Sequence, residues 1–315
     1  MLNKALQLAF TRRGARKTGS LRPFWRPGAA WLLLALAACQ TAPATLPPLA
    51  ASPTIPIPSP VASPTPAATA TPLPTPTPQG CRQTQGQIER YPVETGILAK
   101  PLWVRVYVPP CYNQDPAQHY PVLYLLHGQS TDDELWQRLG ATEVADRLIA
   151  NGEVPPFLIV MPYEEYYLQD PRQSQFGQAL VEGLIPWVDQ QFNTCRERAC
   201  RAIGGISRGA AWAVHVGFED WELFGAIGAH SLPPFINDPY HLPDWLKKIP
   251  EDQRPRLYLD IGRLDPYLKP ASEFEALLTQ YRVPHTWLLN EGTHDEAYWR
   301  SQVEAYLRWY AQGWE

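Results

Sequence analysis

The sequence lacks several patterns that would point to other classes of protein. Its seven histidines include no pair with a metal-ligand spacing such as HExxH, so a metal-dependent mechanism has little support. The apolar run at residues 29–38 is too short to cross a bilayer as a helix. No cysteine stands in a motif typical of a cysteine nucleophile. The chemistry therefore has to be sought in other residues.

Acidic residues are absent from residues 1–38, although seven of the chain's 27 Lys and Arg residues lie there. A basic segment followed by a short apolar run is typical of a secretory signal peptide. The run ends in LAAC (36–39), which resembles the lipobox of bacterial lipoproteins and so implies cleavage before Cys39 and lipidation of Cys39. An ordinary export signal and an uncleaved anchor are the alternatives, and Arg12-Arg13 matches a twin-arginine signal poorly. We expect an exported protein, lipid-anchored on the outer face of the cytoplasmic membrane or secreted.

Charged residues are absent from residues 40–80, where prolines recur among alanine, threonine and serine. Such a segment cannot bury a core and favours extended polyproline II. We predict a disordered Pro/Thr/Ala-rich linker at residues 39–80. At about 3.1 Å per residue, its 36 residues from 43 to 78 reach on the order of 110 Å, which suits a tether.

The remaining segment, residues 81–315, has the size of one α/β domain. Without the signal, 20 Lys and Arg residues face 31 Asp and Glu residues, a net charge near −11. This charge disfavours nucleic acid as a partner.

Four cysteines remain besides Cys39, an even number that suggests two disulfides in an exported protein. Three pairings are formally open. The spacing favours Cys195 with Cys200, and hence Cys81 with Cys111.

Residues 205–209 (GISRG) spell GxSxG, the sequence form of a nucleophile elbow. A nucleophilic serine must stand clear of its backbone at a sharp strand-to-helix turn, where glycines avoid collisions. The context fits, because residues 201–205 read as a buried strand and residues 210–218 as a helix. The alternative is a tight turn capped by a serine at a helix start. We identify Ser207 as the candidate nucleophile.

A carboxylate and a histidine are expected downstream, because the triad of this fold class runs Ser, Asp/Glu, His. Residues 256–262 (RLYLDIG) read as a strand, and Asp265 follows in the next turn. Asp260 competes for the role of the acid, but it lies inside the strand, which favours an internal hydrogen-bonded carboxylate.

The candidate base is His294, in the loop after the predicted strand at residues 285–289. Its alternative is a capping or surface histidine, since a helix is expected from about residue 295 to 309. His230 also ends an apolar strand (224–229), but it precedes the acid and is expected to line the site or pack beneath it. His215 lies within the helix after Ser207 and is expected in the core or on the surface.

The oxyanion donors expected in this fold class are the amide after the nucleophile, that of Arg208, and one from a loop after an earlier strand. Residues 120–126 (YPVLYLL) predict that strand, and the Gln129 amide is the second candidate donor. Gly128 is expected to let the chain turn there, and His127 to buttress the loop.

At this point the chain resembles the "Putative esterase" family of α/β-hydrolases, from about residue 87 to the C-terminus. Its members include esterase D (S-formylglutathione hydrolase), enterochelin, feruloyl and acetyl-xylan esterases, and mycolyltransferases of the antigen 85 type. The similarity rests on separated motifs in order: 120–128 (YPVLYLLHG), 159–162 (IVMP), 176–188 (FGQALVEGLIPWV), 205–209 (GISRG), 224–231 (FGAIGAHS), and the spacing from Asp265 to His294.

The resemblance implies an α/β-hydrolase fold, with a mostly parallel central sheet flanked by helices in a single catalytic domain. It also implies Ser207, Asp265 and His294 as the triad, with Gln129 and Arg208 as oxyanion donors. One departure is visible: many members have two or more small residues after the serine, whereas Trp212 follows Gly209-Ala210-Ala211 here.

These observations predict an exported serine esterase that needs no cofactor and acts on a small-molecule or polysaccharide-linked ester. Residues 163–176 and 232–255 are expected to wall the substrate site or simply to pack. Acyl transfer by the same triad, as in the mycolyltransferases, is one alternative. A non-catalytic surface binding module with this fold is the other.

Overall fold

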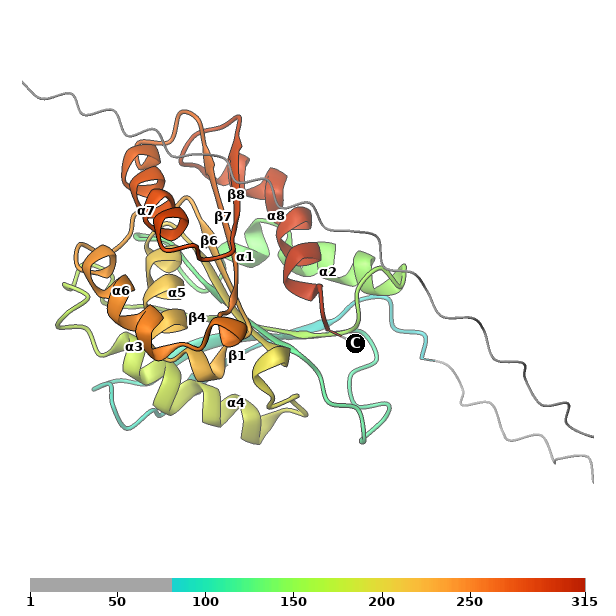
Figure 1. Cartoon of the computed structure of the whole chain (residues 1–315). Helices are drawn as coiled ribbons and strands as arrows, with labels where there is room; N and C mark the ends of the chain where they lie inside the picture. Colours follow the sequence, from blue (N-terminus) through green and yellow to red (C-terminus); the bar gives the residue numbers. More distant parts are fainter. Residues whose placement is uncertain (1–80, 315) are drawn as a thin grey trace, which may run out of the picture. The chain divides into compact units, whose positions relative to one another are not determined.

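The computed structural model describes residues 81–314. The predicted signal segment, Cys39 and the linker lie outside the described residues. One sheet of eight strands, in the order β1-β2-β4-β3-β5-β6-β7-β8, runs through the described part of the chain (Figure 1). The strands are β1 (Gln87–Val93), β2 (Leu102–Val108), β3 (Val122–Leu126), β4 (Leu158–Pro162), β5 (Arg201–Ile206), β6 (Ala226–His230), β7 (Arg256–Gly262) and β8 (Thr286–Asn290).

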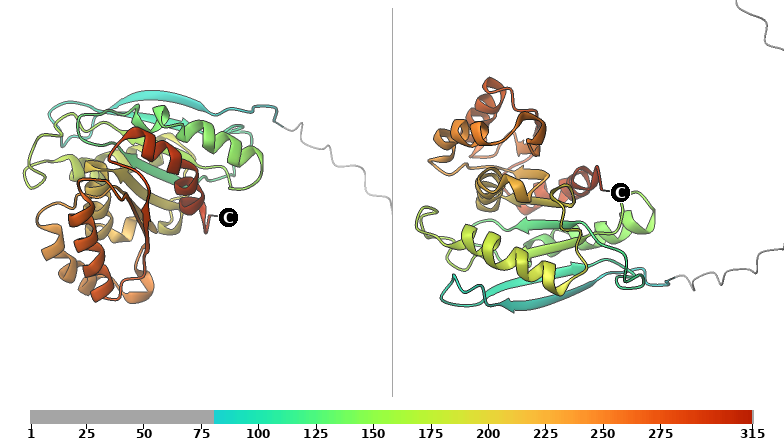
Figure 2. Two further views of the ribbon diagram at one scale, coloured as in Figure 1. Left: turned by 90° about the horizontal axis from the view of Figure 1, so that it is seen from above. Right: turned by 60° about the horizontal axis from the view of Figure 1, so that its bottom comes forward.

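The sheet is antiparallel at one edge and parallel elsewhere. β1 and β2 form a hairpin at that edge, and β2 pairs antiparallel with β4. From β4 to β8 every neighbouring pair is parallel. The hairpin is cyan in both views of Figure 2, at the margin of the domain. A mostly parallel sheet in one domain confirms the predicted fold class.

Helices cover both faces of the sheet. The core on one face contains side chains of α4, α5, α6 and α7, and the core on the other contains side chains of α1, α2 and α8. The helices are α1 (Leu135–Arg138), α2 (Ala141–Ala150), α3 (Phe176–Gln178), α4 (Ile185–Gln191), α5 (Arg208–Glu219), α6 (Asp238–Lys248), α7 (Leu268–Gln280) and α8 (Glu296–Ala311), and a π-helical segment, Ala179–Leu184, joins α3 to α4.

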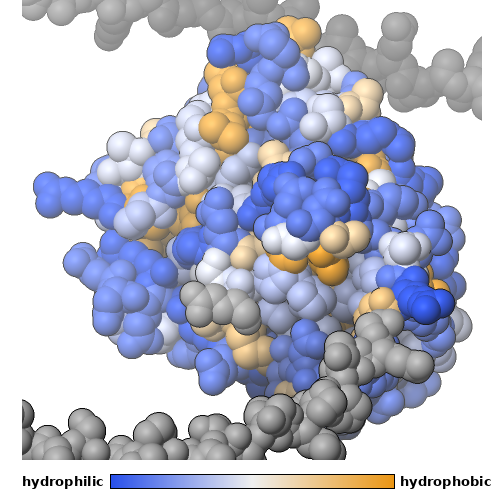
Figure 3. Space-filling view, turned by 90° about the vertical axis from the view of Figure 1, so that its right-hand side faces the viewer, coloured by the Kyte–Doolittle hydropathy of each residue, from blue (hydrophilic) through white to orange (hydrophobic). Residues whose placement is uncertain are grey.

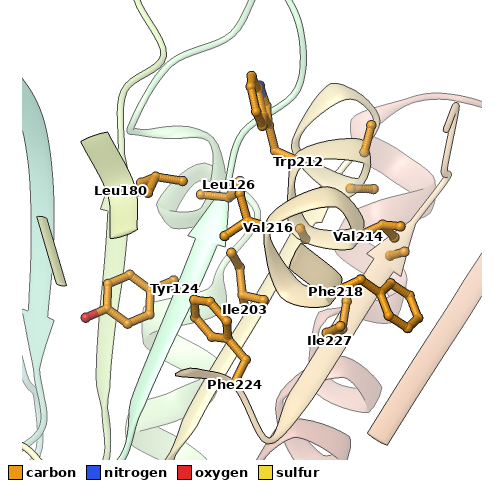
Figure 4. Close-up of a cluster of buried hydrophobic side chains, with 14 of the residues drawn as sticks. Tyr124, Leu126, Leu180, Ile203, Trp212, Val214, Val216, Phe218, Phe224 and Ile227 are labelled. Atoms are coloured by element: carbon orange, nitrogen blue, oxygen red, sulfur yellow. The ribbon is translucent and has the colours of Figure 1, made fainter. Parts of the chain in front are cut away.

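The central strands are apolar along their whole length because both of their faces are covered. Every residue of β3 (VLYLL) and β4 (LIVMP) is buried. Figure 4 shows how α5 packs on this sheet, with Val216 and Phe218 close to Ile203 and Ile227. Trp212 of α5 is buried beside Phe176, so the bulky residue after the GxSxG motif is accommodated.

The predicted strands are all present. The strand predicted at residues 256–262 matches β7 in both bounds, and the ends of the others shift by one or two residues. β3 begins at Val122 rather than at Tyr120, because Pro121 has no amide proton to donate to a ladder. β6 begins at Ala226 rather than at residue 224, since a 3₁₀ turn, Trp221–Leu223, occupies the approach. Its last residue is His230, which places His230 inside the sheet.

Both predicted disulfides are present. Cys81 pairs with Cys111 and Cys195 pairs with Cys200. Within residues 81–314 no helix is long and apolar enough to span a membrane. The surface seen in Figure 3 is mainly hydrophilic, with scattered hydrophobic residues.

Candidate active site

Ser207 occupies a sharp turn between β5 and α5. Its backbone has φ 55° and ψ −121°, a left-handed conformation that residues other than glycine rarely adopt. The two glycines of the motif make the turn possible. A Cβ on Gly205 would lie 2.3 Å from the Gly209 carbonyl carbon, and a Cβ on Gly209 would lie 2.4 Å from the Leu126 carbonyl oxygen. The turn therefore packs backbone against backbone.

The structure brings Ser207, His294 and Asp265, hereafter the candidate triad, into one hydrogen-bonded chain. His294 Nε2 lies 2.9 Å from Ser207 Oγ, and His294 Nδ1 lies 2.8 Å from Asp265 Oδ2. The three residues follow the carboxyl ends of β5, β8 and β7, which meet at the same edge of a parallel sheet. This arrangement can remove the serine proton as the hydroxyl attacks an electrophile.

Asp265 is held as an anion facing His294. Burial disfavours its ionisation, but hydrogen bonds from His294 and the Tyr267 amide outweigh that effect and keep the Asp265 pKa below its ordinary value. The rings of Tyr267 and Trp299 lie edge-on to His294, with centroids 4.9 and 5.1 Å away. The base is thus confined on two sides while Nε2 faces Ser207.

Asp260, the rival candidate acid, lies elsewhere. It is 1% exposed and bonds His230, with 2.6 Å between Asp260 Oδ1 and His230 Nδ1. His230 pairs with Ile206, the residue before the nucleophile, and its carbonyl accepts the Ser207 amide proton at 2.9 Å. The structure therefore contains two separate histidine–aspartate pairs. His215, the remaining candidate, bonds Asp238 of α6 at 2.9 Å.

The loop after β3 lies directly beside the nucleophile. The Gly128 carbonyl accepts hydrogen bonds from His127 Nδ1 and Thr131 Oγ1, both at 2.7 Å. In a trans peptide the C=O and N–H groups point in opposite directions, so the Gln129 amide points away from these two side chains. A Cβ on Gly128 would lie 3.5 Å from Ser207 Cβ, which places this peptide next to the serine.

Neither the Gln129 amide nor the Arg208 amide donates to a protein acceptor within residues 81–314. Both are expected oxyanion donors, and both are free to bind a ligand atom. The expected role of Gly128 as the turning residue is wrong in detail, because the left-handed residue of this loop is Ser130, with φ 63°. A Cβ at Gly128 would make only ordinary contacts.

An ion pair that the sequence did not predict joins the nucleophile turn to the segment after β4, next to the site. The Arg208 guanidinium donates to both carboxylate oxygens of Glu164, at 2.8 and 2.6 Å, and to the Gln169 carbonyl at 3.0 Å. The Glu164 amide in turn donates to His127 Nε2 at 2.8 Å, and burial lowers the His127 pKa, so that ring accepts as a neutral imidazole. The sequence offered one signal for this ion pair: Glu164-Glu165 follows β4, whose carboxyl end lies at the same edge of the sheet as the turn at Ser207.

A cavity of about 420 Å³ opens beside Arg208 and Gln129. Its walls come from residues 167–172 and residues 234–238, together with His215. Both segments that were expected to wall the site contribute to it. Within residues 81–314 no group of three His, Cys, Asp or Glu side chains is placed to hold a metal ion.

A GxSxG turn at the carboxyl end of a mostly parallel sheet, with an aspartate and then a histidine following in the chain, defines the class of α/β-hydrolases. The family model described as "Putative esterase" matches residues 96–310, and the chain belongs to that family.

Among curated proteins, an endo-1,4-beta-xylanase/feruloyl esterase of Xylanibacter ruminicola is 30% identical over 168 residues, which are 49% of this chain and 23% of that protein. Esterase Rv1288 of Mycobacterium tuberculosis is 28% identical over 161 residues, 48% of this chain and 34% of that protein. The chain thus spans about a third or less of these relatives' length. A solved ferulic acid esterase shares the fold, with a TM-score of 0.66 at 23% identity, covering 73% of this chain and 99% of that one.

Proposed function

We propose that this protein is a serine esterase that hydrolyses carboxylic esters through an acyl-enzyme. The observation that carries the proposal is the unbroken hydrogen-bonded chain from Ser207 Oγ through His294 to Asp265. Family membership supports the reaction class. A binding module without activity would have no need of a strained serine at φ 55°.

In the proposed mechanism Ser207 Oγ attacks the ester carbonyl while His294 Nε2 takes the hydroxyl proton. Asp265 orients His294 through Nδ1 and stabilises the imidazolium that forms. The amides of Gln129 and Arg208 donate to the oxyanion as the carbonyl becomes tetrahedral. His294 then returns the proton to the leaving alcohol. Water, activated by the same histidine, attacks the acyl-enzyme and releases the acid and Ser207. This sequence of steps requires no cofactor.

The substrate we propose is a small-molecule ester or an ester linked to a polysaccharide. The cavity beside Arg208 supports this, because it combines apolar walls at Leu168, Phe235 and Ile236 with polar groups such as Gln129. Relatives named for feruloyl ester hydrolysis make feruloyl esters the first natural substrates to try.

The test is steady-state hydrolysis of p-nitrophenyl esters of increasing chain length, alongside feruloyl and acetylated sugar esters. We expect turnover that the Ser207→Ala variant loses. Absence of turnover on every ester, with the protein folded, counts against the proposal. An excess of transesterified product over free acid when a sugar acceptor is added would instead favour acyl transfer.

We further propose that the protein works outside the cytoplasm, anchored by lipid at Cys39. The two disulfides support an oxidising compartment. A Cys39→Ser variant is expected to leave the detergent phase on phase partitioning. Retention of that variant in the detergent phase would contradict the anchor.

A further inference from the structure

A second histidine–carboxylate pair lies buried behind the candidate triad. His230 Nδ1 bonds Asp260, and His230 Nε2 lies 2.9 Å from the Tyr310 hydroxyl. The arrangement repeats that of the candidate triad, with a phenol in place of the serine. His230 and Asp260 are only 0% and 1% exposed, so a substrate cannot reach them. Any effect of this pair on catalysis must pass through the groups around it.

The Asp260 carboxylate accepts two further hydrogen bonds, both from α8. Asp260 Oδ2 lies 2.5 Å from the Tyr298 hydroxyl and 2.7 Å from the Tyr306 hydroxyl. Burial, and then the charge of Asp260, raises the pKa of both phenols well above the ordinary value, so both remain donors. Three donors thus satisfy a carboxylate that would otherwise be costly to bury.

Tyr298 is also the contact point of the loop that carries His294, here called the base loop (residues 291–295). Its hydroxyl accepts a hydrogen bond from Asn290, the last residue of β8, at 3.2 Å. A Cβ on Gly292 would lie 2.4 Å from the Tyr298 ring, so the base loop backbone rests directly on that ring. The Tyr298 amide donates to Asp295 at 2.9 Å. Tyr298 therefore contacts the residue before the base loop, the middle of the loop and its last residue.

Tyr306 donates to the same carboxylate oxygen but lies two turns further along α8. Its ring stacks on His230, with centroids 3.6 Å apart. Within residues 81–314 its hydroxyl makes no hydrogen bond to the base loop. The two tyrosines are thus matched in burial and in their bond to Asp260, and they differ in contact with the base loop.

Further hydrogen bonds connect the base loop to the acid's turn and His230 to the nucleophile. The Leu264 amide, next to Asp265, donates to the Gly292 carbonyl at 3.0 Å, which joins the acid's turn to the base loop. On the other side, the His230 carbonyl accepts the Ser207 amide proton at 2.9 Å. Asp260 consequently has a short path of direct contacts to each member of the candidate triad.

We propose that Asp260 is a positioning residue for the candidate triad and that Tyr298 transmits its hold to His294. The catalytic consequence rests on the proposed function. Loss of the Tyr298 hydroxyl removes its hydrogen bonds to Asp260 of β7 and to Asn290, which loosens the base loop while the ring stays against Gly292. A base misplaced by about 1 Å costs up to about 100-fold in rate, so partial loosening should cost roughly tenfold.

The test compares Tyr298→Phe with its matched control Tyr306→Phe in the full-length protein, using p-nitrophenyl acetate. Each variant removes one hydroxyl from Asp260 Oδ2, so similar losses of Tm are expected. Tyr298→Phe should lower kcat roughly tenfold at unchanged KM, and Tyr306→Phe should stay within about twofold of the wild type. Equal losses of kcat in the two variants would overturn the proposal.

Hydrogen exchange supplies a readout that does not depend on activity. Peptides covering residues 262–266 and 290–297 should exchange faster in Tyr298→Phe than in Tyr306→Phe, because the first variant alone releases the base loop. Equal exchange in both variants overturns the positioning role. If the wild type hydrolyses no ester, the proposed function fails while the exchange comparison still decides this inference.

Discussion

Because the structure contains two histidine–aspartate pairs, the same Asp→Asn substitution should impair catalysis in one pair and folding stability in the other. Asp265→Asn removes the negative charge that faces His294, whereas Asp260→Asn removes the charge that faces His230 and the two α8 phenols. Both changes preserve the size and shape of the side chain. The first should act on chemistry and the second mainly on folding.

The magnitudes follow from burial and from the number of donors. Without its carboxylate, His294 loses the partner that orients it and stabilises the imidazolium, which costs about 10³- to 10⁴-fold in kcat, or roughly 4 to 5.5 kcal/mol. Asp260 satisfies three buried donors, and an amide would turn its NH₂ group toward one of them. We expect Asp260→Asn to destabilise the fold by roughly 3 to 5 kcal/mol, lowering Tm by about 10 °C, with only about a tenfold loss of kcat.

The assay measures kcat per folded molecule below the transition, together with Tm by circular dichroism. Asp265→Asn should lose turnover and keep a Tm within a few degrees of the wild type. The reasoning is refuted if Asp260→Asn, while folded, loses turnover more severely than Asp265→Asn does.

Two further predictions concern the framework of the site, and a third concerns Asp220, which follows the end of α5. Gly209→Ala places a Cβ 2.4 Å from the Leu126 carbonyl oxygen and should lower the free energy of unfolding by roughly 3 kcal/mol, measured by thermal unfolding. Its control, Gly128→Ala, should lower it by less than about 1 kcal/mol. Equal losses in the two variants would contradict the packing described. Glu164→Gln leaves the Arg208 guanidinium without its anion and should cost roughly 3 kcal/mol, against less than about 1 kcal/mol for Glu165→Gln, whose Lys100 partner is exposed. Burial and the charges of Glu219 and Glu222 raise the pKa of Asp220 to about 6, so its ionised form destabilises the fold. Asp220→Asn should therefore raise Tm by a few degrees at pH 8, where the carboxylate is charged. It should leave Tm unchanged near pH 4, where the carboxyl group is neutral. A Tm gain that is the same at both pH values would contradict that pKa.

The order of the chemistry-bearing residues could be predicted from the sequence, because each lies just after an apolar strand. The order Ser, Asp, His that this fold class uses then selects Ser207, Asp265 and His294. The structure brings them together because the carboxyl ends of parallel strands meet at one edge of the sheet. Asp265 was preferred over Asp260 for a similar reason, because Asp265 lies in the turn after the strand and Asp260 lies inside it. The spacing of Cys195 and Cys200 likewise limited their pairing.

The buried network could not be predicted in this way, because its members are far apart in the chain and share no local pattern. Tyr310 reaches His230 only because β5 and β6 carry Gly204 and Gly228 side by side, where a Cβ would lie within 1.8 Å of its hydroxyl oxygen. In the sequence these two glycines look like ordinary breaks in apolar strands. Their role is to leave room for Tyr310, and it depends on α8 covering that face of the sheet, which only tertiary packing determines.

The loop after β3 shows a similar limit. The sequence suggested Gly128 as the turning residue, yet Ser130 adopts the left-handed conformation. The hydrogen bonds of His127 and Thr131 to the Gly128 carbonyl stabilise the loop and orient the Gln129 amide. The position of a glycine in the sequence therefore does not predict the turning residue when side chains stabilise the turn by hydrogen bonds to its carbonyl groups.

The central claim is that Ser207 is an activated nucleophile, and labelling with a fluorophosphonate probe tests it most directly. The purified protein should be labelled at one site, with the adduct mapped by mass spectrometry to the peptide that contains Ser207. Ser207→Ala should abolish labelling, and Asp265→Asn should slow it strongly. A folded protein that is not labelled, or that is labelled equally after Ser207→Ala, would contradict the claim.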